Sequence, residues 1–239
     1  TNEDGSIDSS VSVNQTLGMS VGTFTSADNN AKTIGHGLGV KPLMVIVKVT
    51  STTDGWATWH TGLSSASYKV RLNDTIAQLS VGDVSWNATE PTSSVFSVKS
   101  DGETGATGRT FMFMAFAPSE YISIGSYTGN ANTDGAFVPL LNSVGVPLQP
   151  IFMLGKRSSA VTSWFINNAA TDPYNVVKTQ LVPSGTNAEL SGSPYYVDYV
   201  SGGVKNRTTN DSNNAGGTYI HLTIGIPTID ADGRILAGR

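Results

Sequence analysis

One internal repeat limits the folds open to this chain more than any other feature of its sequence. Ser20–Thr25 (SVGTFT) recurs as Ser123–Thr128 (SIGSYT), and Pro42–Ile46 (PLMVI) recurs as Pro150–Leu154 (PIFML). The spacing between matched residues is 103 at the first match (20 to 123) and 108 at the second (42 to 150), so a loop of the second copy is five residues longer. A unit of about a hundred residues is too long for a solenoid repeat and has the size of a small domain.

The repeat divides the chain into a first copy, 18–118, and a second copy, 119–227. Residues 1–17 precede the copies and show little hydrophobic periodicity, and a short segment, 228–239, follows them. Terminal segments of this kind are commonly linkers. We therefore expect an N-terminal arm or linker and a C-terminal tail that reach a neighbouring subunit.

Nearly all secondary-structure signals in both copies indicate β-strands. Short runs of β-branched and aromatic residues are separated by Gly, Asn, Asp, Ser or Pro, and no convincing amphipathic helix interrupts them. The strongest runs are VGTFT, LMVIVKV, WATWH, YKVRL, SVFSVK, TFMFMAFA, ISIGSYT, IFMLGKR, SWFIN, YYVDYV and TYIHLTIGI. LMVIV and FMFMAFA are hydrophobic at successive positions, which predicts central strands. The sequence predicts an all-β chain with two tandem antiparallel β-sandwiches.

The composition disfavours several classes of partner. A net charge of −4 with only 13% charged residues provides no basic surface for a phosphate backbone, so we expect no nucleic-acid binding. The longest hydrophobic runs are far shorter than the roughly 20 residues of a membrane helix, so we expect no membrane insertion. Because the chain contains no cysteine, disulfides and thiol chemistry are excluded.

Three glycines surround His36 in the segment GHGLG (35–39). A phosphate-binding loop of this composition would follow a strand and open a helix, whereas this segment precedes a strand. The second copy retains Gly145 opposite Gly37 but has Val144 opposite His36. We therefore predict that His36 packs in a turn and has no catalytic role.

The sequence contains no residue pattern that is typical of a catalytic site. The chain lacks a Gly-x-Ser-x-Gly elbow, and its two candidate carboxylate pairs, Asp101 with Glu103 and Asp83 with Glu90, lie in turn-like segments. We expect these acids to be solvated and the protein not to be an enzyme. Three histidines, together with the incomplete calcium-like runs 211–214 and 230–233, do not make a metal site, so we predict no metal and no cofactor.

Aromatic side chains beside polar residues are the best candidates for ligand binding. An exposed ring next to amide and hydroxyl groups can stack on a sugar and hydrogen-bond to it. The alternative is that the same rings pack under loops or against a neighbouring subunit. The candidate glycan-binding residues are Trp59, His60, Trp86, Tyr174, Tyr195 and Tyr196.

Several sequence segments together resemble a tandem module of tailed-phage structural proteins, especially tail-fibre and receptor-binding components. These segments are GSIDSSVSVNQT, GMSVGTFT, TIGHGLGVKPLMVIVK, SWNATEPTSSVFSV, GRTFMFMAFAP, SIGSYTGNANTDGAFV, DPYNVV and NAGGTYI. The resemblance implies lectin-like, jelly-roll β-sandwiches in a virion protein that forms a homotrimer or a higher homo-oligomer. It supplies no catalytic residues.

The function expected from these observations is a non-enzymatic virion component on the particle surface, which contacts other virion proteins and a host surface polysaccharide. A first alternative is a purely structural subunit of a filament, tube or capsid decoration, assembled through its terminal arms. A second alternative is a glycan-degrading enzyme, which requires two carboxylates in one groove.

Overall fold

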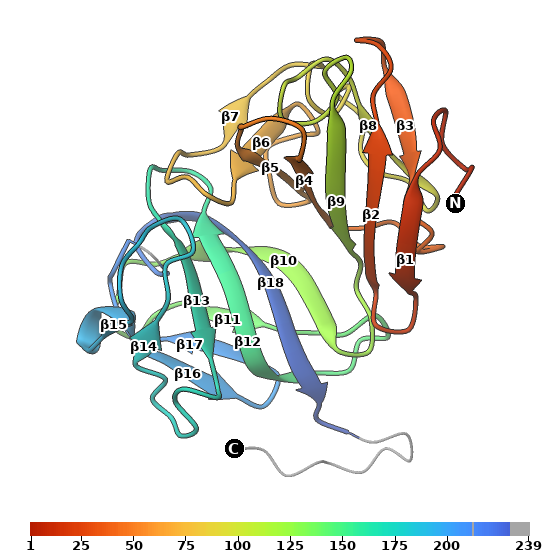
Figure 1. The fold of residues 1–239 in the computed structure, drawn as a ribbon. Coiled ribbons are helices and arrows are strands. Elements are labelled where there is room, and N and C mark those ends of the chain that lie inside the picture. Colours follow the sequence, from red (N-terminus) through yellow and green to blue (C-terminus); the bar gives the residue numbers. More distant parts are fainter. Residues whose placement is uncertain (212, 230–239) are drawn as a thin grey trace. The chain divides into compact units, whose positions relative to one another are not determined.

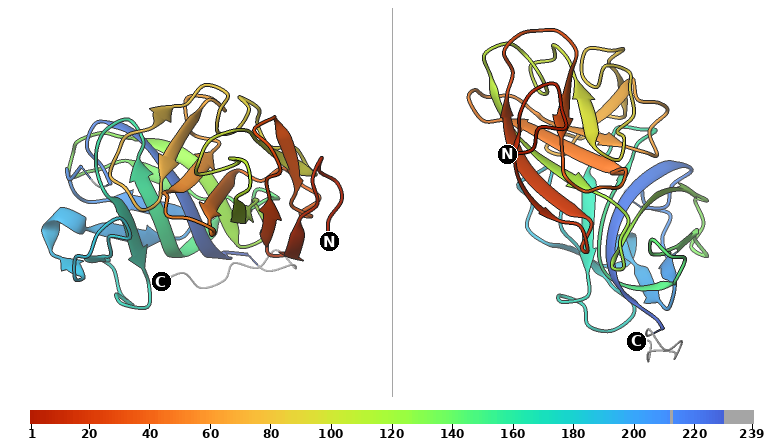
Figure 2. Two further views of the ribbon diagram at one scale, coloured as in Figure 1. Left: turned by 45° about the horizontal axis from the view of Figure 1, so that its top comes forward. Right: turned by 90° about the vertical axis from the view of Figure 1, so that its right-hand side faces the viewer.

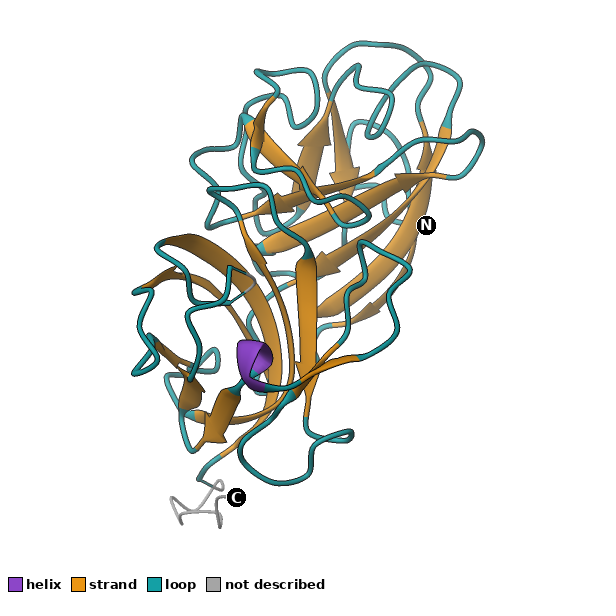
Figure 3. Cartoon of the chain, turned by 90° about the vertical axis from the view of Figure 1, so that its left-hand side faces the viewer, coloured by secondary structure: helices purple, strands orange, loops and turns teal. Residues whose placement is uncertain are grey.

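The computed structural model of the chain describes residues 1–211 and 213–229. Within them every regular element is a β-strand except for one short 3₁₀ turn (Figures 1 and 3). The chain forms two compact units. Unit 1 comprises Thr1–Asn73 and Gln78–Ala117, and unit 2 comprises Asp74–Ala77 and the chain from Pro118 onward. The described residues contain no helix that is both long and hydrophobic enough to span a membrane.

Unit 1 is a β-sandwich of two antiparallel sheets. The larger sheet has the strand order β1-β2-β9-β4-β5-β6-β7, and β3 pairs with β8 in the smaller one. Side chains from both sheets form its core, where the Phe96 ring of β8 meets the Phe113 ring of β9 edge-on at 5.1 Å between centroids. The strands are β1 (Ser10–Asn14), β2 (Met19–Thr25), β3 (Lys32–Gly35), β4 (Met44–Val49), β5 (Trp56–His60), β6 (Tyr68–Arg71), β7 (Leu79–Ser80), β8 (Val95–Val98) and β9 (Thr110–Phe116).

Unit 2 is also sandwich-like, with sheets of order β10-β18-β12-β13 and β11-β17-β16 and a small β14-β15 pair. In its core the Tyr127 and Tyr219 rings stack at 4.9 Å, and Val204 of β17 packs in the same cluster. Its elements are β10 (Ile122–Gly129), β11 (Phe137–Pro139), β12 (Leu148–Arg157), β13 (Trp164–Asn168), β14 (Thr179–Gln180), β15 (Leu190–Ser191), the 3₁₀ turn η1 (Ser193–Tyr195), β16 (Val197–Val200), β17 (Gly203–Asn206) and β18 (Gly217–Pro227). The prediction of an all-β chain with two antiparallel β-sandwiches is confirmed.

The internal repeat is preserved in the pairing of individual residues. The order β2-β9-β4-β5 of unit 1 recurs as β10-β18-β12-β13 in unit 2. Lys48 pairs with Trp56 between β4 and β5, and Lys156 pairs with Trp164 between β12 and β13. The two copies therefore share strand order and register, not only sequence.

The length difference between the copies is divided between two loops. Ile34 of β3 pairs with Phe96, and Val138 of β11 pairs with Val204. The first members of these pairs are 104 residues apart (34 to 138) and the second members 108 (96 to 204). One extra residue therefore lies before β11 and four lie after it, rather than all five in a single insertion.

The N-terminal residues 1–17 form part of unit 1. Their Ser10–Asn14 strand, β1, pairs antiparallel with β2 at the edge of the large sheet (Figure 2). Ile7 and Val11 pack against the core of the same unit. These residues thus complete a sheet in their own chain instead of extending away from it as the expected arm. Residues 230–239 of the expected C-terminal tail lie outside the described residues.

Candidate functional site

Three of the six predicted glycan-binding residues are buried in unit 1. Trp59 and Trp86 are each 2% exposed and belong to its hydrophobic core, and His60 is 1% exposed. Trp59 and His60 lie on β5, an interior strand between β4 and β6. Because a surface sugar cannot reach these rings, the prediction for these three residues is wrong.

The three predicted tyrosines lie in loops of unit 2. Tyr174 follows β13 and is 82% exposed, whereas Tyr195 and Tyr196 are half-buried at and just after η1. Tyr174 and Tyr196 line the same pocket, although they are 22 residues apart in the sequence (174 to 196). Two side chains that the sequence suggested separately are thus brought together.

This hollow, the Tyr174 pocket, has a volume of about 690 Å³. Most of it is made by a single loop between β13 and β14, and Tyr196 adds a wall from a second segment. Its polar groups are hydroxyls, amides, one carboxylate and one ammonium group, a mixture suited to a polar ligand with an apolar face. The lining residues are Thr171, Asp172, Pro173, Tyr174, Asn175, Val176, Lys178, Thr179 and Tyr196.

Asp172 closes the base of the pocket loop. Its Oδ2 accepts hydrogen bonds from the Lys178 N–H at 2.9 Å, the Thr179 N–H at 2.8 Å and the Thr179 hydroxyl at 2.6 Å. Burial on its own would raise the pKa of Asp172, but the bonds from Thr179 and Lys178 outweigh it and lower that pKa. The Asp172 carboxylate is therefore ionised, and its hydrogen bonds hold the two ends of the loop together.

Asn175 fastens the loop on the other side of Tyr174. Its Nδ2 donates to the Tyr199 carbonyl at 2.7 Å, and its Oδ1 accepts from the Tyr199 N–H at 2.9 Å. The side-chain amide of Asn175 thereby forms the same two hydrogen bonds with the β16 backbone that the backbone of a neighbouring strand would form. Val177 adds two backbone bonds to Val197 at 2.9 and 3.0 Å. Tyr174 is thus an exposed ring on a loop fixed at residues 172, 175 and 177, which lowers the entropic cost of ligand binding.

The first copy lacks the two rings of this pocket. Trp56 and Trp164 are 108 residues apart, and so are β8 and β17, so the chain between them has the same length in both copies. Within that stretch, however, the equivalent pairs Lys69–Leu79 and Gln180–Leu190 are 111 residues apart. At this spacing Leu63 corresponds to Tyr174 and Ser85 to Tyr196, and neither is aromatic. The Tyr174 pocket is therefore a feature of the second copy rather than of the repeated fold.

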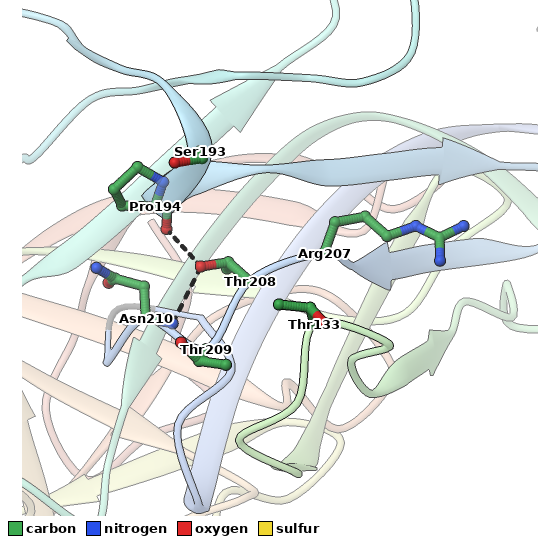
Figure 4. A pocket seen from close by; sticks show the side chains of 7 residues that line it. All are labelled: Thr133, Ser193, Pro194, Arg207, Thr208, Thr209 and Asn210. Atoms are coloured by element: carbon green, nitrogen blue, oxygen red, sulfur yellow. Dashed lines mark hydrogen bonds between the residues drawn. The ribbon is translucent and has the colours of Figure 1, made fainter.

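Two smaller pockets adjoin the same region of the chain. Figure 4 shows one of about 380 Å³, in which the Thr208 hydroxyl donates to the Pro194 carbonyl at 3.0 Å and accepts from the Asn210 N–H at 3.1 Å. The other, of about 230 Å³, is lined in part by Tyr195 and Asn210. The segment 193–196 thus contributes to three pockets, and Tyr195 faces a different one from Tyr196.

The two candidate carboxylate pairs have different environments. Glu103 is 2% exposed, and its Oε2 lies 2.7 Å from the Lys69 ammonium group. Lys69 also forms an ion pair with Asp101, and Arg71 forms one with Glu103. The expectation that Asp101 and Glu103 are solvated is therefore wrong, because both belong to a buried ion network in unit 1. Neither lines any of the pockets described above.

Asp83 and Glu90, by contrast, are exposed as expected, and each forms an ion pair at 2.5 Å with a nearby lysine, Lys99 and Lys41 respectively. The two carboxylates therefore interact with separate lysines at the surface.

His36 is a buried turn residue, as predicted. Its Nε2 donates to the Thr92 carbonyl at 3.2 Å, and its Nδ1 accepts the Leu38 N–H at 3.2 Å. Burial lowers the pKa of His36, which is consistent with a neutral ring. Gly37 and Gly145 share positive φ angles of 70° and 82°, a conformation that favours glycine.

The calcium-like run 211–214 forms part of a turn in the residues that the structure describes. Asn214 is fully buried, and its Nδ2 donates to Asn130 Oδ1 at 3.0 Å and to the Asn132 and Thr208 carbonyls. The second run, 230–233, lies outside the described residues. Across 1–211 and 213–229 no group of three or more His, Asp or Glu side chains is placed to hold a metal ion.

Comparisons with known proteins place the whole repeat in one family. Its description is a domain of unknown function (DUF7483), and it matches residues 1–225, a range that contains β1, the Tyr174 pocket and both sandwiches up to the last two residues of β18. No curated protein and no solved structure matches the chain. The match covers most of the chain and runs through both copies, and this chain belongs to the DUF7483 family.

Proposed function

We propose that this protein is a non-enzymatic carbohydrate-binding module and that the Tyr174 pocket is its binding site. The observation that carries the proposal is the Tyr174 ring, which is 82% exposed on a loop fastened on both sides. A single exposed ring is ordinary at a protein surface, but a ring on a fixed loop beside hydrogen-bonding groups is an arrangement that suits sugar binding.

The chemistry of the pocket suits a sugar. The C–H face of a pyranose packs on an aromatic ring, while its hydroxyls need donors and acceptors around the rim. Tyr174 and Tyr196 supply rings, and Thr171 and Lys178 add a hydroxyl and an ammonium group to the lining. Since the protein is nearly neutral overall, recognition rests on stacking and hydrogen bonds more than on charge.

The pocket supports binding rather than cleavage. Glycoside hydrolysis uses two carboxyl groups that flank the scissile bond. Asp172 is the one acidic residue among those that line the pocket, and its Oδ2 is occupied by three donors from its own loop. This arrangement supports the non-enzymatic proposal over the glycan-degrading alternative.

We place this module on a virion surface because of the sequence resemblance to tailed-phage tail-fibre and receptor-binding components. The carbohydrate would then be a host surface polysaccharide, and the chain would assemble as a homotrimer or a higher homo-oligomer with other virion proteins. Several copies of one weak site, displayed together, bind a repetitive glycan far more tightly than a single site does.

A glycan array with the purified chain tests the proposal. We expect binding to at least one bacterial surface polysaccharide, and a loss of affinity of about tenfold or more in Tyr174→Ala and Tyr196→Ala, equivalent to about 1.4 kcal/mol. Phe137→Ala removes another exposed ring of unit 2, one outside the pocket, and should bind as the wild type does.

Absence of binding to every glycan would overturn the proposal and favour the purely structural role in assembly. An equal loss of affinity in Phe137→Ala would overturn the assignment of the site to the Tyr174 pocket.

A further inference from the structure

The equivalent strands β2 and β10 differ in what lies along their outer edges. Met19 of β2 pairs with Phe116, and Ile122 of β10 pairs with Ile224, so both strands have the same register against the centre of their sheets. On its other side β2 pairs with β1, whereas β10 is the edge strand of its sheet. The edge that β1 covers in unit 1 therefore has no covering strand in unit 2 among the described residues.

Part of this edge is open to solvent. Ile122–Ile124 is buried, Gly125 is partly exposed, and Ser126 and Thr128 are exposed. Within the described residues, the backbone of 123–128 is paired with β18 alone. Natural proteins usually protect such an edge with lysine, proline, a bulge or a covering segment. The sequence ISIGSYTG of β10 contains neither charge nor proline.

Unit 1 shows which chemistry fits an edge of this kind. The strand on β2 is Ser10–Asn14, SVSVN, which is uncharged and alternates hydroxyl and aliphatic side chains. Ser10 lies opposite Thr23, and Val11 lies opposite Gly22. At the spacing of 103 residues, the same pairing would set Ser10 of such a segment opposite Ser126 and its Val11 opposite Gly125.

The chain that precedes β10 does not supply this strand. In the first copy the covering strand comes just before β2, but the segment at the corresponding place before β10 contains β9, which occupies the centre of the unit 1 sheet. The protein's own β1 is paired with β2. No strand among the described residues lies along the β10 edge, and we therefore look for its donor in another polypeptide.

We infer that the accessible edge of β10 is an acceptor site for a short, uncharged strand that alternates serine or threonine with valine or isoleucine. Another polypeptide supplies this strand, which binds antiparallel to β10 as β1 binds β2. Strand addition of this kind gains its affinity from backbone hydrogen bonds and its register from alternate side chains. The site is independent of carbohydrate binding at the Tyr174 pocket.

Disulfide trapping tests the site, because the natural chain contains no cysteine. The probe is a synthetic peptide of residues 6–17 with Ser10→Cys, incubated with the full-length Ser126→Cys protein in a glutathione redox buffer. We expect the mixed disulfide to form about tenfold faster than with a peptide that carries Ser12→Cys, because Ser12 would lie opposite Ile124. The Ser143→Cys protein, altered in an exposed loop, provides the matched control thiol.

Equal rates for the two peptides or for the two proteins would overturn the inference. Preferential disulfide dimerisation of Ser126→Cys, without peptide and faster than that of Ser143→Cys, would overturn it in favour of β10 pairing with a second copy. A peptide with proline in place of Asp8 and Ser9, which would lie opposite Thr128 and Tyr127 at the accessible part of the edge, tests backbone pairing, because adjacent N–H groups in a strand point to opposite sides. Unchanged trapping of that peptide would contradict strand addition.

Hydrogen exchange provides a readout that needs no substitution. In the free protein we expect the outward-facing amide of β10 at Gly125–Ser126 to exchange at least about tenfold faster than its equivalent of β2 at Gly22–Thr23, which β1 covers. Saturation with the unmodified peptide of residues 6–17 should slow exchange at Gly125–Ser126. Slow exchange there in the free protein, or no change with peptide, would overturn the inference.

Discussion

Gly125 of β10 lies directly opposite His221 of β18, whose Nε2 is 3.2 Å from the place a Cβ at residue 125 would take. In unit 1 the equivalent Gly22 lies opposite Phe113, where a Cβ would come within 2.6 Å of the ring and 2.7 Å of the Ser10 carbonyl oxygen. Both copies therefore place a glycine under an aromatic ring, but unit 1 has the tighter contact.

This difference predicts unequal costs for the same substitution. Gly22→Ala should lower the free energy of unfolding by about 2–3 kcal/mol, because both a buried ring and the backbone of β1 would have to move. Gly125→Ala should cost about 1 kcal/mol or less, since only the His221 ring has to shift. Urea denaturation of both variants measures the difference, and equal costs would contradict the assigned packing.

Lys156 predicts a gain of stability at alkaline pH. Burial lowers the pKa of this fully buried lysine to about 8, although Asp74 opposes the shift. Between about pH 8 and the ordinary value of 10.5 the unfolded chain therefore binds a proton that the folded chain does not. Stability should rise from pH 8 to 10 by up to about 1.4 kcal/mol per pH unit.

Denaturation from pH 7 to 10 measures this slope. Lys156→Met should remove it, whereas Lys48→Met, at the equivalent position of the first copy, should retain it. The scan ends at pH 10 because burial raises the pKa of Tyr219 to about 12, which makes stability fall once tyrosines ionise in the unfolded chain. A slope that persists in Lys156→Met would refute the assignment to this residue.

The buried ion network of unit 1 predicts a large cost when one partner is removed. Glu103→Gln would remove the negative charge that faces the buried Lys69 and the partly exposed Arg71. Because Lys69 would keep its ion pair with Asp101, we expect a cost of about 3 kcal/mol in the free energy of unfolding. The surface pair offers a control, because Glu90→Gln should cost less than about 1 kcal/mol. Thermal or urea unfolding distinguishes the two, and a comparably small effect of Glu103→Gln would be inconsistent with a buried network.

The turn at His36 predicts a loss of stability in mild acid. Burial holds the pKa of His36 below its ordinary value of 6.5, so as pH falls through 6.5 the unfolded chain takes up a proton before the folded one. The contribution of the neutral His36 to the free energy of unfolding is fully present above pH 6.5, and it decreases as pH falls toward the pKa of His36 in the folded chain. NMR titration should find the His36 ring titrating below 6.5, and a midpoint above 6.5 would disprove this environment.

Much of the fold could be predicted from the sequence because its long strands carry strong local signals. All eleven segments predicted as strands contain strands of the structure. LMVIV was predicted to be a central strand, and the corresponding β4 is buried on both faces. FMFMAFA was predicted to be central too, and β9 is central, although its second face is only half-buried. Short strands such as β14 (Thr179–Gln180) were missed, because two paired residues have no periodicity and depend on tertiary contacts.

The candidate site was predicted only in part, for a physical reason. Trp59 has polar neighbours in the sequence, but Thr58 and His60 are themselves buried, so polarity beside a ring did not signal exposure. The pairing of Tyr174 with Tyr196 depends on the backbone bonds between Val177 and Val197. Such contacts between distant segments have no local signal in a single sequence.

The division of the chain into units has a practical consequence for anyone wishing to isolate the Tyr174 pocket. Unit 2 includes Asp74–Ala77, and the Thr75 carbonyl accepts hydrogen bonds from the Thr162 N–H at 2.8 Å and from the Lys156 ammonium group at 3.2 Å. A fragment cut at residue 118 would lack this acceptor and leave a buried ammonium group short of a partner. The boundary between the two sequence copies is therefore not a place at which the protein can be cut. The smallest fragment that keeps the Tyr174 pocket intact contains both copies.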